Sequence, residues 1–280
     1  MFGVALGINT SDFVELRKNP RAVFGGVLSQ FAFLPVLTFI LVILSKPHPA
    51  LALGMILVAA CPGGNISNFF SSISGANVSL SVTLTAIATL LSPLMTPLNF
   101  EFWSSQWSET EVLLRSFRLN FFDMLNTVLI LLVFPLILGI AFKKRFQKLT
   151  SKIEKPIRIL SILILFGFIG VALSNNWEVF KNHLGLVFLL VLVHNLIALS
   201  VGYFTGMGFR LNDHLRRTLS IETGIQNSGL GLIIIFNFFD GNGGMAMITA
   251  WWGVWHILAG FAASYFFRFR DKRVSQHNPS

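Results

Sequence analysis

The 280-residue sequence contains few charged residues and a single cysteine, and both scarcities exclude classes of protein. Only 12% of the residues are Asp, Glu, Lys or Arg, whereas 54% are hydrophobic, and the mean hydropathy is +0.70. So few charges cannot cover the surface of a water-soluble domain of this length. A lone cysteine, Cys61, excludes an internal disulfide. The composition therefore indicates an integral membrane protein.

The apolar residues are gathered into long runs. A transmembrane helix needs about 20 consecutive apolar residues, and eight runs approach or exceed this length. They are continuous rather than alternating, which favours helices over the strands of a membrane barrel. We therefore predict an all-α integral membrane protein with about eight full transmembrane helices and an N-terminal partial helix at Met1–Ile8. The runs are Ala22–Leu44, Ala50–Phe70, Val78–Leu98, Met124–Phe142, Ile157–Leu173, Leu184–Met207, Thr218–Phe239 and Met245–Phe267.

The formal net charge is +9, and its distribution indicates a membrane protein rather than a nucleic-acid-binding protein. Most of the 21 Lys and Arg residues lie in alternate segments between the runs, and such segments normally face the cytoplasm. This predicts a multi-pass protein of the inner (plasma) membrane with a cytoplasmic C-terminus. The basic residues on the predicted cytoplasmic side are Arg17, Lys18, Arg21, Lys143, Lys144, Arg145, Lys148, Lys152, Lys155, Arg158, Arg210, Arg216, Arg217, Arg268, Arg270, Lys272 and Arg273.

Two runs are interrupted by helix-breaking residues next to polar ones. The second run contains Cys61-Pro62-Gly63-Gly64-Asn65-Ile66-Ser67-Asn68, and the seventh contains Glu222-Thr223-Gly224-Ile225-Gln226-Asn227-Ser228-Gly229. Interrupted spans in corresponding positions of two halves are typical of inverted-repeat transporters. One interruption alone is equally consistent with a packing kink. Two polar interruptions in matching positions favour an ion or substrate site, because irregular backbone at membrane depth lines cavities or is buried in protein.

These motifs resemble those of the bile acid:sodium symporter family. The first match runs from Cys61-Pro62-Gly63-Gly64 through Ser67-Asn68, Asn77-Val78, Leu80-Ser81 and Ser92-Pro93-Leu94 to Thr96-Pro97. The second comprises Ile221-Glu222, Gly224 and Gln226-Asn227-Ser228-Gly229-Leu230. Shorter matches are Ser11-Asp12-Phe13, Gln30-Phe31-Ala32, His194-Asn195 and Trp255-His256. The resemblance extends from Met1 to about Tyr265.

The resemblance implies two inverted five-helix repeats with two broken helices that cross. Six helices form a core and four form a flatter panel. On that template the sequence is expected to begin near the end of the second helix, so an inactive, N-terminally truncated fragment stays an alternative. The expected division is residues 1–21, remnant of a panel helix and a cytoplasmic loop; 22–100, core helices of the first repeat; 101–123, external loop; 124–175, panel helices; 176–268, core helices of the second repeat; and 269–280, cytoplasmic tail.

Glu222 is the one acidic residue inside an apolar run, where a carboxylate is costly and usually functional. Pairing with Arg217 near the membrane surface is the alternative. A hard cation prefers oxygen ligands, and Ser81 and Thr85 lie four residues apart on one helix face. The resemblance implies two Na+ sites, one formed by Ser67, Asn68, Ser81, Thr85 and Glu222 and the other by Gln30, Glu222, Gln226 and the carbonyls of Thr223 and Ile225. Taken singly, Ser81, Thr85 or Gln30 could instead bridge helices.

The half-helices after the two breaks should direct free N–H groups and positive dipole ends into the crossing. This predicts a small organic anion, a carboxylate, as the substrate, contacted by Asn65, Ile66 and Asn227. His256 is a further candidate, although a hydrogen bond to a neighbouring helix would also explain it. His194 and Asn195 are expected to bridge helices.

Together these features predict a sodium-coupled symporter that carries the anion across the lipid bilayer by alternating access, as a monomer. An enzyme is not expected, because the runs contain no carboxylate pair and no nucleophile–base arrangement. A proton-coupled anion carrier, with Glu222 as the proton site, is the main alternative.

Overall fold

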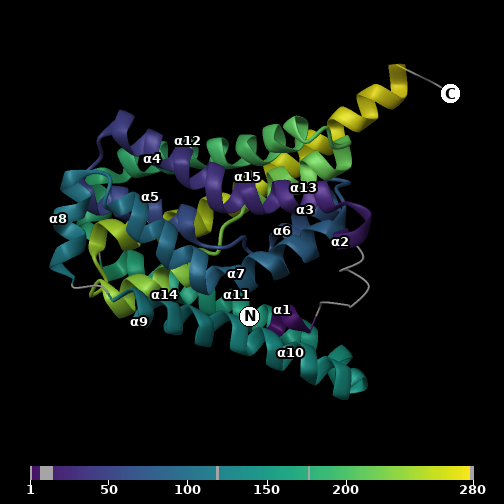
Figure 1. Ribbon diagram of the computed structural model, residues 1–280, viewed down its shortest axis with the longest axis horizontal. Helices are drawn as coiled ribbons and strands as arrows, with labels where there is room; N and C mark the ends of the chain where they lie inside the picture. The colour runs from purple at the N-terminus through teal and green to yellow at the C-terminus, as the bar shows by residue number, and fades with distance from the viewer. Residues whose placement is uncertain (1, 7–14, 118–119, 176, 278–280) are drawn as a thin grey trace.

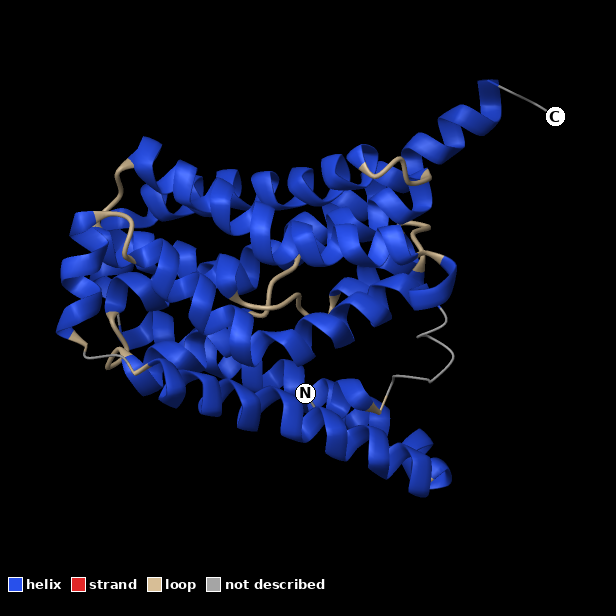
Figure 2. Ribbon diagram, viewed as in Figure 1, coloured by secondary structure: helices blue, strands red, loops and turns tan. Residues whose placement is uncertain are grey.

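The computed structural model describes residues 2–6, 15–117, 120–175 and 177–277. Within these ranges it contains helices, turns and loops, with no β-strand beyond one isolated bridge between Gly63 and Gln226 (Figure 2). The predicted all-α fold is therefore confirmed. The ends of the partial helix Met1–Ile8 and the motif Ser11-Asp12-Phe13 lie outside the described residues.

The helices follow one another in the order shown in Figure 1. They are α1 Phe2–Ala5, α2 Glu15–Lys18, α3 Pro20–Leu28, the π-helical turn η2 Ser29–Phe33, α4 Leu34–Ser45, α5 Pro49–Ala60, α6 Ser67–Ile73, α7 Val78–Ser104, α8 Ser108–Ser116, α9 Phe121–Val128, the π-helical turn η3 Leu129–Val133, α10 Phe134–Arg145, α11 Gln147–Asn175, α12 Trp177–Gly208, α13 Asp213–Gly224, α14 Ser228–Phe238 and α15 Gly243–His277.

Five continuous helical segments among the described residues are long and apolar enough to cross a membrane: Pro20–Ser45, Val78–Ser104, Phe121–Arg145, Leu184–Gly208 and Gly243–Arg270. Each corresponds to one of the runs in the sequence. The run Ile157–Leu173 lies inside α11, and the two interrupted runs are divided between α5 and α6 and between α13 and α14. The structure therefore agrees with an integral membrane protein, while the count of eight crossings and the inverted repeat stay predictions.

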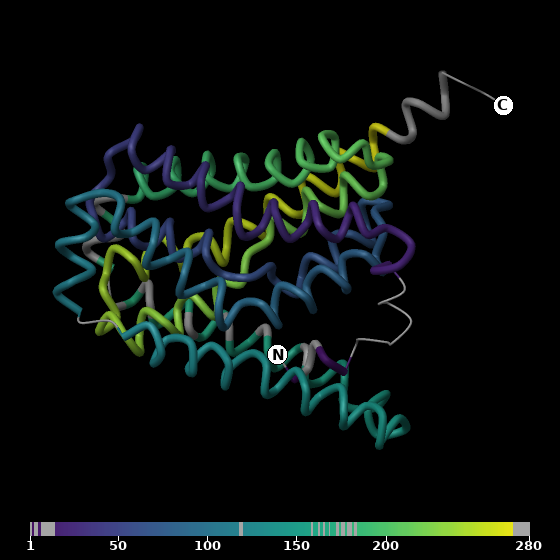
Figure 3. Tube along the Cα trace, in the orientation of Figure 1, coloured from purple at the N-terminus to yellow at the C-terminus, as the bar shows by residue number. Residues whose placement is uncertain are grey.

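The helices form two groups in space. Figure 1 shows α9, α10, α11 and the short α1 along one side of the bundle, with α3, α4, α12 and α13 on the other side. The long α15 contacts helices of both groups, including α11 and α12. The trace in Figure 3 shows that segments distant in sequence lie together, such as the purple N-terminal helices beside the green α12. Between residues 101 and 123, expected to form an external loop, the chain is largely helical and includes α8.

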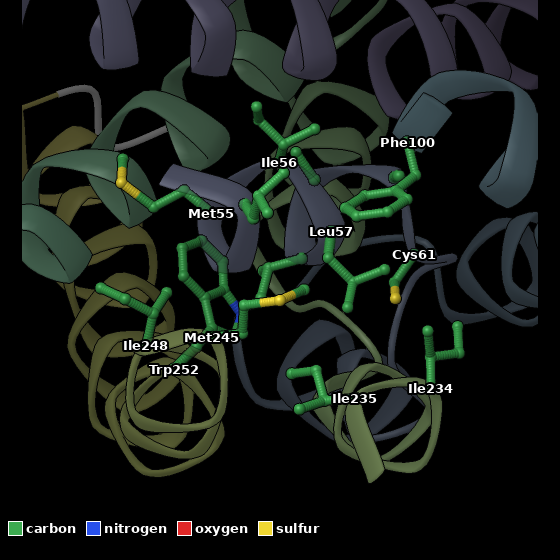
Figure 4. Close-up of a cluster of buried hydrophobic side chains, with 14 of the residues drawn as sticks. Met55, Ile56, Leu57, Cys61, Phe100, Ile234, Ile235, Met245, Ile248 and Trp252 are labelled. Atoms are coloured by element: carbon green, nitrogen blue, oxygen red, sulfur yellow. The ribbon is translucent and has the colours of Figure 1, made fainter. Parts of the chain in front are cut away.

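The apolar core surrounds α5, whose residues from Ala50 to Ala60 are all buried. A helix that is hydrophobic all round belongs in the interior. Figure 4 shows Leu57 of α5 among Ile235 of α14 and Met245 and Trp252 of α15. Outside the bundle, large apolar side chains are exposed instead, including Phe122 at 68% and Phe204 at 64%. An apolar exterior of this kind suits contact with lipid tails rather than with water.

Candidate functional site

The candidate site is built around the two points where helices break. The α5 helix ends at Ala60 because the residue before a proline disfavours helical backbone, and Cys61, which precedes Pro62, is extended (φ −69°, ψ 154°). The α13 helix ends at Gly224, and Ile225 is extended (φ −111°, ψ 103°). Each break separates a helix from a shorter continuation, α6 or α14. Both predicted interruptions are therefore true breaks in the helices.

The two breaks cross each other and pair through their backbones. The N–H of Gly64 donates to the carbonyl of Ile225 at 2.7 Å, and the N–H of Asn227 donates to the carbonyl of Pro62 at 2.9 Å. These bonds satisfy backbone groups that have no helical partner. A Cβ atom on Gly64 would lie 2.8 Å from the carbonyl oxygen of Gln226, so the crossing requires a residue without a side chain there.

Glu222 accepts hydrogen bonds from hydroxyl groups on two other helices. Ser67 Oγ and Ser81 Oγ donate to its Oε2 at 2.7 Å and 3.0 Å, and Thr85 Oγ1 donates to its Oε1 at 2.6 Å. The side-chain oxygen of Asn68 lies 3.5 Å from Thr85 Oγ1. The carboxylate and the three hydroxyls are all buried. The structure thus brings together the five side chains expected to form the first Na+ site.

A second cluster consists of amides and carbonyls. Gln30 Nε2 donates to Gln226 Oε1 at 2.9 Å, and Gln226 Nε2 donates back to Gln30 Oε1 at 3.2 Å. Gln30 Nε2 also lies 2.9 Å from the carbonyl of Cys61, and Gln226 Nε2 lies 2.6 Å from that of Thr223. The carbonyl of Ile225 is held by Gly64. Gln30, Gln226 and Thr223, expected to form the second site, therefore meet at the crossing, and Ile225 contributes to the backbone bridge. Glu222, expected in both sites, is hydrogen-bonded to the hydroxyls of the first.

Gln30 lies in the π-helical turn η2, whose presence follows from the sequence. Pro35 has no N–H, so it cannot donate to the carbonyl of Phe31 four residues earlier. The chain widens instead, and the N–H of Leu34 donates to the carbonyl of Ser29, five residues back. Wide turns of this type are frequent at functional sites. Here the turn places Gln30 against the crossing.

Arg217, the alternative partner of Glu222, pairs with the carboxylate of Asp213 instead. Its Nε donates to Asp213 Oδ2 at 2.6 Å, its Nη1 donates to the carbonyl of Ser74 at 3.0 Å, and its guanidinium lies 5.5 Å from the centre of the Phe267 ring. Pairing with Glu222 is therefore not needed to balance the charge of this buried arginine. The contact with Ser74 also ties α13 to the C-terminal end of α6.

The residues expected to contact the substrate lie around the same breaks. Asn65 and Ile66 precede α6, and Asn227 caps α14 by accepting from the N–H of Leu230 at 3.1 Å. His256 of α15 is buried, and no described residue is a hydrogen-bond partner of its Nδ1. It lies on the α15 face that packs against Ser228 at Gly253 and against Phe70 at Gly260. Helical spacing therefore directs His256 toward the two half-helices.

Two further hydroxyls, which the sequence does not single out, adjoin these clusters. Ser71 Oγ donates to Ser81 Oγ at 3.1 Å, and Ser29 Oγ lies 2.8 Å from Thr223 Oγ1. The four-residue spacing from Ser67 to Ser71 could have indicated the first, because such residues share a helix face. Ser29 gives no comparable indication. His194 and Asn195, expected to bridge helices, do so through Thr38 and Gly224.

Comparison with known proteins agrees with the resemblance. Residues 1–183 match the family model described as the sodium bile acid symporter family. The chain belongs to the sodium bile acid symporter family. The family and its named relatives are transporters. This confirms the expectation that the protein is not an enzyme.

Similar proteins occur in bacteria, plants and animals. The chain is 31% identical over 260 residues to the uncharacterized sodium-dependent transporter YocS of Bacillus subtilis. The alignment covers 93% of this chain and 78% of the relative. It is 29% identical over 270 residues to the probable sodium/metabolite cotransporter BASS2, chloroplastic, of rice, covering 96% of this chain and 62% of the relative. The P3 protein of mouse is 31% identical over 224 residues, 79% of this chain and 46% of the relative. The chain thus spans less than two thirds of the rice and mouse relatives.

Proposed function

We propose that the protein is a sodium-coupled symporter that carries a small organic anion by alternating access. The observation that carries the proposal is the meeting of Glu222 with Ser67, Ser81 and Thr85, which gathers a carboxylate and three hydroxyl oxygens from α13, α6 and α7 at a crossing of broken helices. Hydroxyls can rotate, so groups that donate to the carboxylate can turn their lone pairs to a cation. All-oxygen coordination suits a hard ion such as Na+.

Two Na+ ions per cycle are proposed. The first is held by Ser67, Asn68, Ser81, Thr85 and Glu222. The second lies by the amide cluster. There the side-chain oxygens of Gln30 and Gln226 each accept from the other's Nε2, and the carbonyl of Thr223 accepts from Gln226 Nε2. The names of the bacterial and plant relatives, which describe sodium-dependent transport and sodium/metabolite cotransport, support sodium as the coupling ion.

The proposed substrate is a carboxylate held at the crossing. The first turn of a helix presents N–H groups without partners in that helix, and its positive end favours an anion. The α14 helix begins at Ser228, which packs against Gly253 of α15, one helical turn from buried His256. Among the described residues, Nδ1 of His256 has no hydrogen-bond partner. Asn227, together with Asn65 and Ile66 at the opposite break, completes the proposed contact set. A neutral imidazole can donate one hydrogen bond to a carboxylate.

The proposed transport cycle needs one group of helices to move against the other. Residues 22–100 and 176–268 form the proposed core, which holds the crossing, and residues 124–175 form the panel. We place the protein in the plasma membrane as a monomer with its C-terminal tail in the cytoplasm, as the basic segments indicate. Movement of the panel would then expose the crossing to each side in turn.

The proposal is tested by uptake into liposomes that contain the purified protein. A panel of radiolabelled small carboxylates is presented under an inward NaCl gradient and under a matched KCl gradient. The proposal requires at least one anion to accumulate with NaCl alone. Accumulation driven by a pH gradient in sodium-free buffer would contradict it and favour proton coupling through Glu222.

A further inference from the structure

Asn195 is a buried polar residue of α12 that contacts one of the two breaks. Its side chain has an exposed fraction of 0%, and its Nδ2 donates to the carbonyl of Gly224 at 2.7 Å. Gly224 is the last residue of α13, where carbonyl groups have no helical partner. Asn195 therefore supplies a donor to a carbonyl that the helix itself leaves free.

Gly224 lies between Thr223 and Ile225, whose carbonyls belong to the proposed sodium site. Its φ and ψ angles, together with those of Ile225, set how the carbonyl of Thr223 is oriented relative to the carbonyl of Ile225. Glycine allows more backbone conformations than any other residue. A Cβ atom on Gly224 would also lie 2.3 Å from the side chain of Leu199, so α12 occupies the space beside Gly224. Among the described contacts within α13, the peptide between Gly224 and Ile225 is held only through the N–H of Ile225, which donates to the carbonyl of Ile221 at 3.0 Å. Its carbonyl is held from outside α13, by Asn195.

We propose that Asn195 is a positioning residue for sodium, which holds the peptide between Gly224 and Ile225 so that the carbonyl of Thr223 faces Gln226 at the crossing. The inference rests on the proposed function. Without the amide donor, the carbonyl of Gly224 would be buried and unpaired, a state that rotation of the peptide relieves. That rotation would misdirect the carbonyl of Thr223, and sodium would bind less tightly.

A purely structural role is the competing explanation, and the same helix offers a matched comparison. His194, one residue away on α12, makes a hydrogen bond of 2.7 Å between its Nε2 and Thr38 Oγ1. Both bonds are buried and join α12 to another helix. Only the bond of Asn195 reaches the break. Thr38→Val, which keeps the side-chain shape, therefore removes a comparable bond without altering the crossing.

The test is a sodium titration of the purified protein in detergent. The apparent melting temperature is measured at each NaCl concentration, with KCl added to keep the ionic strength constant. Wild-type protein, Asn195→Leu and Thr38→Val are compared. A ligand that binds the folded state raises its stability by RT ln(1 + L/Kd), where L is the free ligand concentration, so the shift depends on ligand concentration relative to Kd. Asn195→Leu is expected to need about tenfold more NaCl than wild type for the same sodium-specific shift, whereas Thr38→Val should need the same amount as wild type.

The outcomes separate the two claims. If wild-type protein gains no stability from NaCl over KCl, the proposed sodium coupling fails and this inference fails with it. If wild type responds and Asn195→Leu shows the same sodium-specific shift at the same NaCl concentration, Asn195 is a packing residue and only this inference is overturned. Should Asn195→Leu not fold, Asn195→Ser, whose shorter side chain cannot reach Gly224, is titrated in its place with the same expected tenfold change.

Discussion

The backbone N–H of Gly64 donates a hydrogen bond to the carbonyl of Ile225 at 2.7 Å, joining two helix breaks that are 161 residues apart in the chain. This bond and its partner between Asn227 and Pro62 hold the breaks in register. The register places the first turn of α6 beside the last turn of α13. Ser67 consequently reaches Glu222. The ion cluster thus depends on backbone pairing as much as on its own side chains.

Replacing Gly64 by Ala should disrupt the crossing. The new Cβ atom would lie 2.8 Å from the carbonyl oxygen of Gln226, a backbone atom that cannot move without shifting the bridge. Overpacking of this kind costs about 1–3 kcal/mol. We expect a lower melting temperature and no sodium-driven uptake. The matched control is Gly167→Ala on α11, where an added Cβ meets nothing within 4 Å. Equal uptake by the two variants would contradict the close approach described here.

Pro35→Ala should weaken sodium binding although it removes a helix-breaking residue. With an N–H restored at position 35, the widened turn at Ser29–Phe33 can close into regular α-helix, which rotates Gln30 away from Gln226. We expect the sodium concentration for half-maximal uptake to rise about tenfold, equivalent to roughly 1.4 kcal/mol. Pro135→Ala, which stands in the same relation to the turn Leu129–Val133, serves as the control and should leave this concentration unchanged. A common response of both variants would argue against a specific role for the first turn.

Thr85→Val should raise the sodium requirement without unfolding the protein. The substitution keeps the shape of the side chain and removes the hydroxyl that lies 2.6 Å from Glu222 Oε1. Loss of one oxygen ligand is expected to raise the half-saturating sodium concentration about tenfold, or roughly 1.4 kcal/mol. Thr89→Val, one turn further along α7, removes a hydroxyl bonded only to the helix carbonyl of Thr85 among the described contacts. The melting temperature of Thr89→Val should rise with NaCl concentration as that of wild type does.

Asp213→Asn should lower stability in a pH-dependent way. Burial raises the pKa of Asp213, but hydrogen bonds from Arg270 and Arg217 outweigh it and hold the pKa below its ordinary value. A carboxylate with a lowered pKa stabilises the fold above its unfolded pKa of about 3.9 and loses this contribution as pH falls through the folded pKa. Its side chain is 36% exposed, so we expect only about 1–2 kcal/mol.

The measurement for Asp213 is the difference in melting temperature between wild type and Asp213→Asn from pH 8 to pH 3. This difference should stay constant down to about pH 5 and shrink below about pH 4. Asp240→Asn, at an exposed position, is the control and should show no such difference. A difference that grew with acidity would show that the sign of the pKa shift is wrong.

Much of the site follows from local sequence rules. Pro62 with two glycines, and Gly224 after a polar stretch, predict breaks because proline and glycine end helices. The position of Glu222 inside an apolar run predicts a functional carboxylate, since such a charge is costly there. The four-residue spacing of Ser81 and Thr85 predicts their common face. These rules act within one or two helical turns, which is why the sequence alone reveals them.

Other features depend on contacts between distant segments. The bridge between Gly63 and Gln226 requires both breaks to lie at the same depth, which no local pattern specifies. The contact of Arg217 with Ser74 requires the end of α6 to reach α13. The bond from Asn195 to Gly224 depends on how α12 packs against α13. Only the folded chain brings these partners together, so the sequence predicts a helix bridge at Asn195 but not its partner.

The most direct test of the central claim is sodium-driven uptake by Glu222→Ala in liposomes, with wild type measured in the same experiment and with the exposed Glu109→Ala as the control. Removal of the carboxylate leaves Ser67, Ser81 and Thr85 without the acceptor around which they gather. The account predicts that Glu222→Ala accumulates no anion under a NaCl gradient, while Glu109→Ala matches wild type. Undiminished sodium-driven uptake by Glu222→Ala would contradict it.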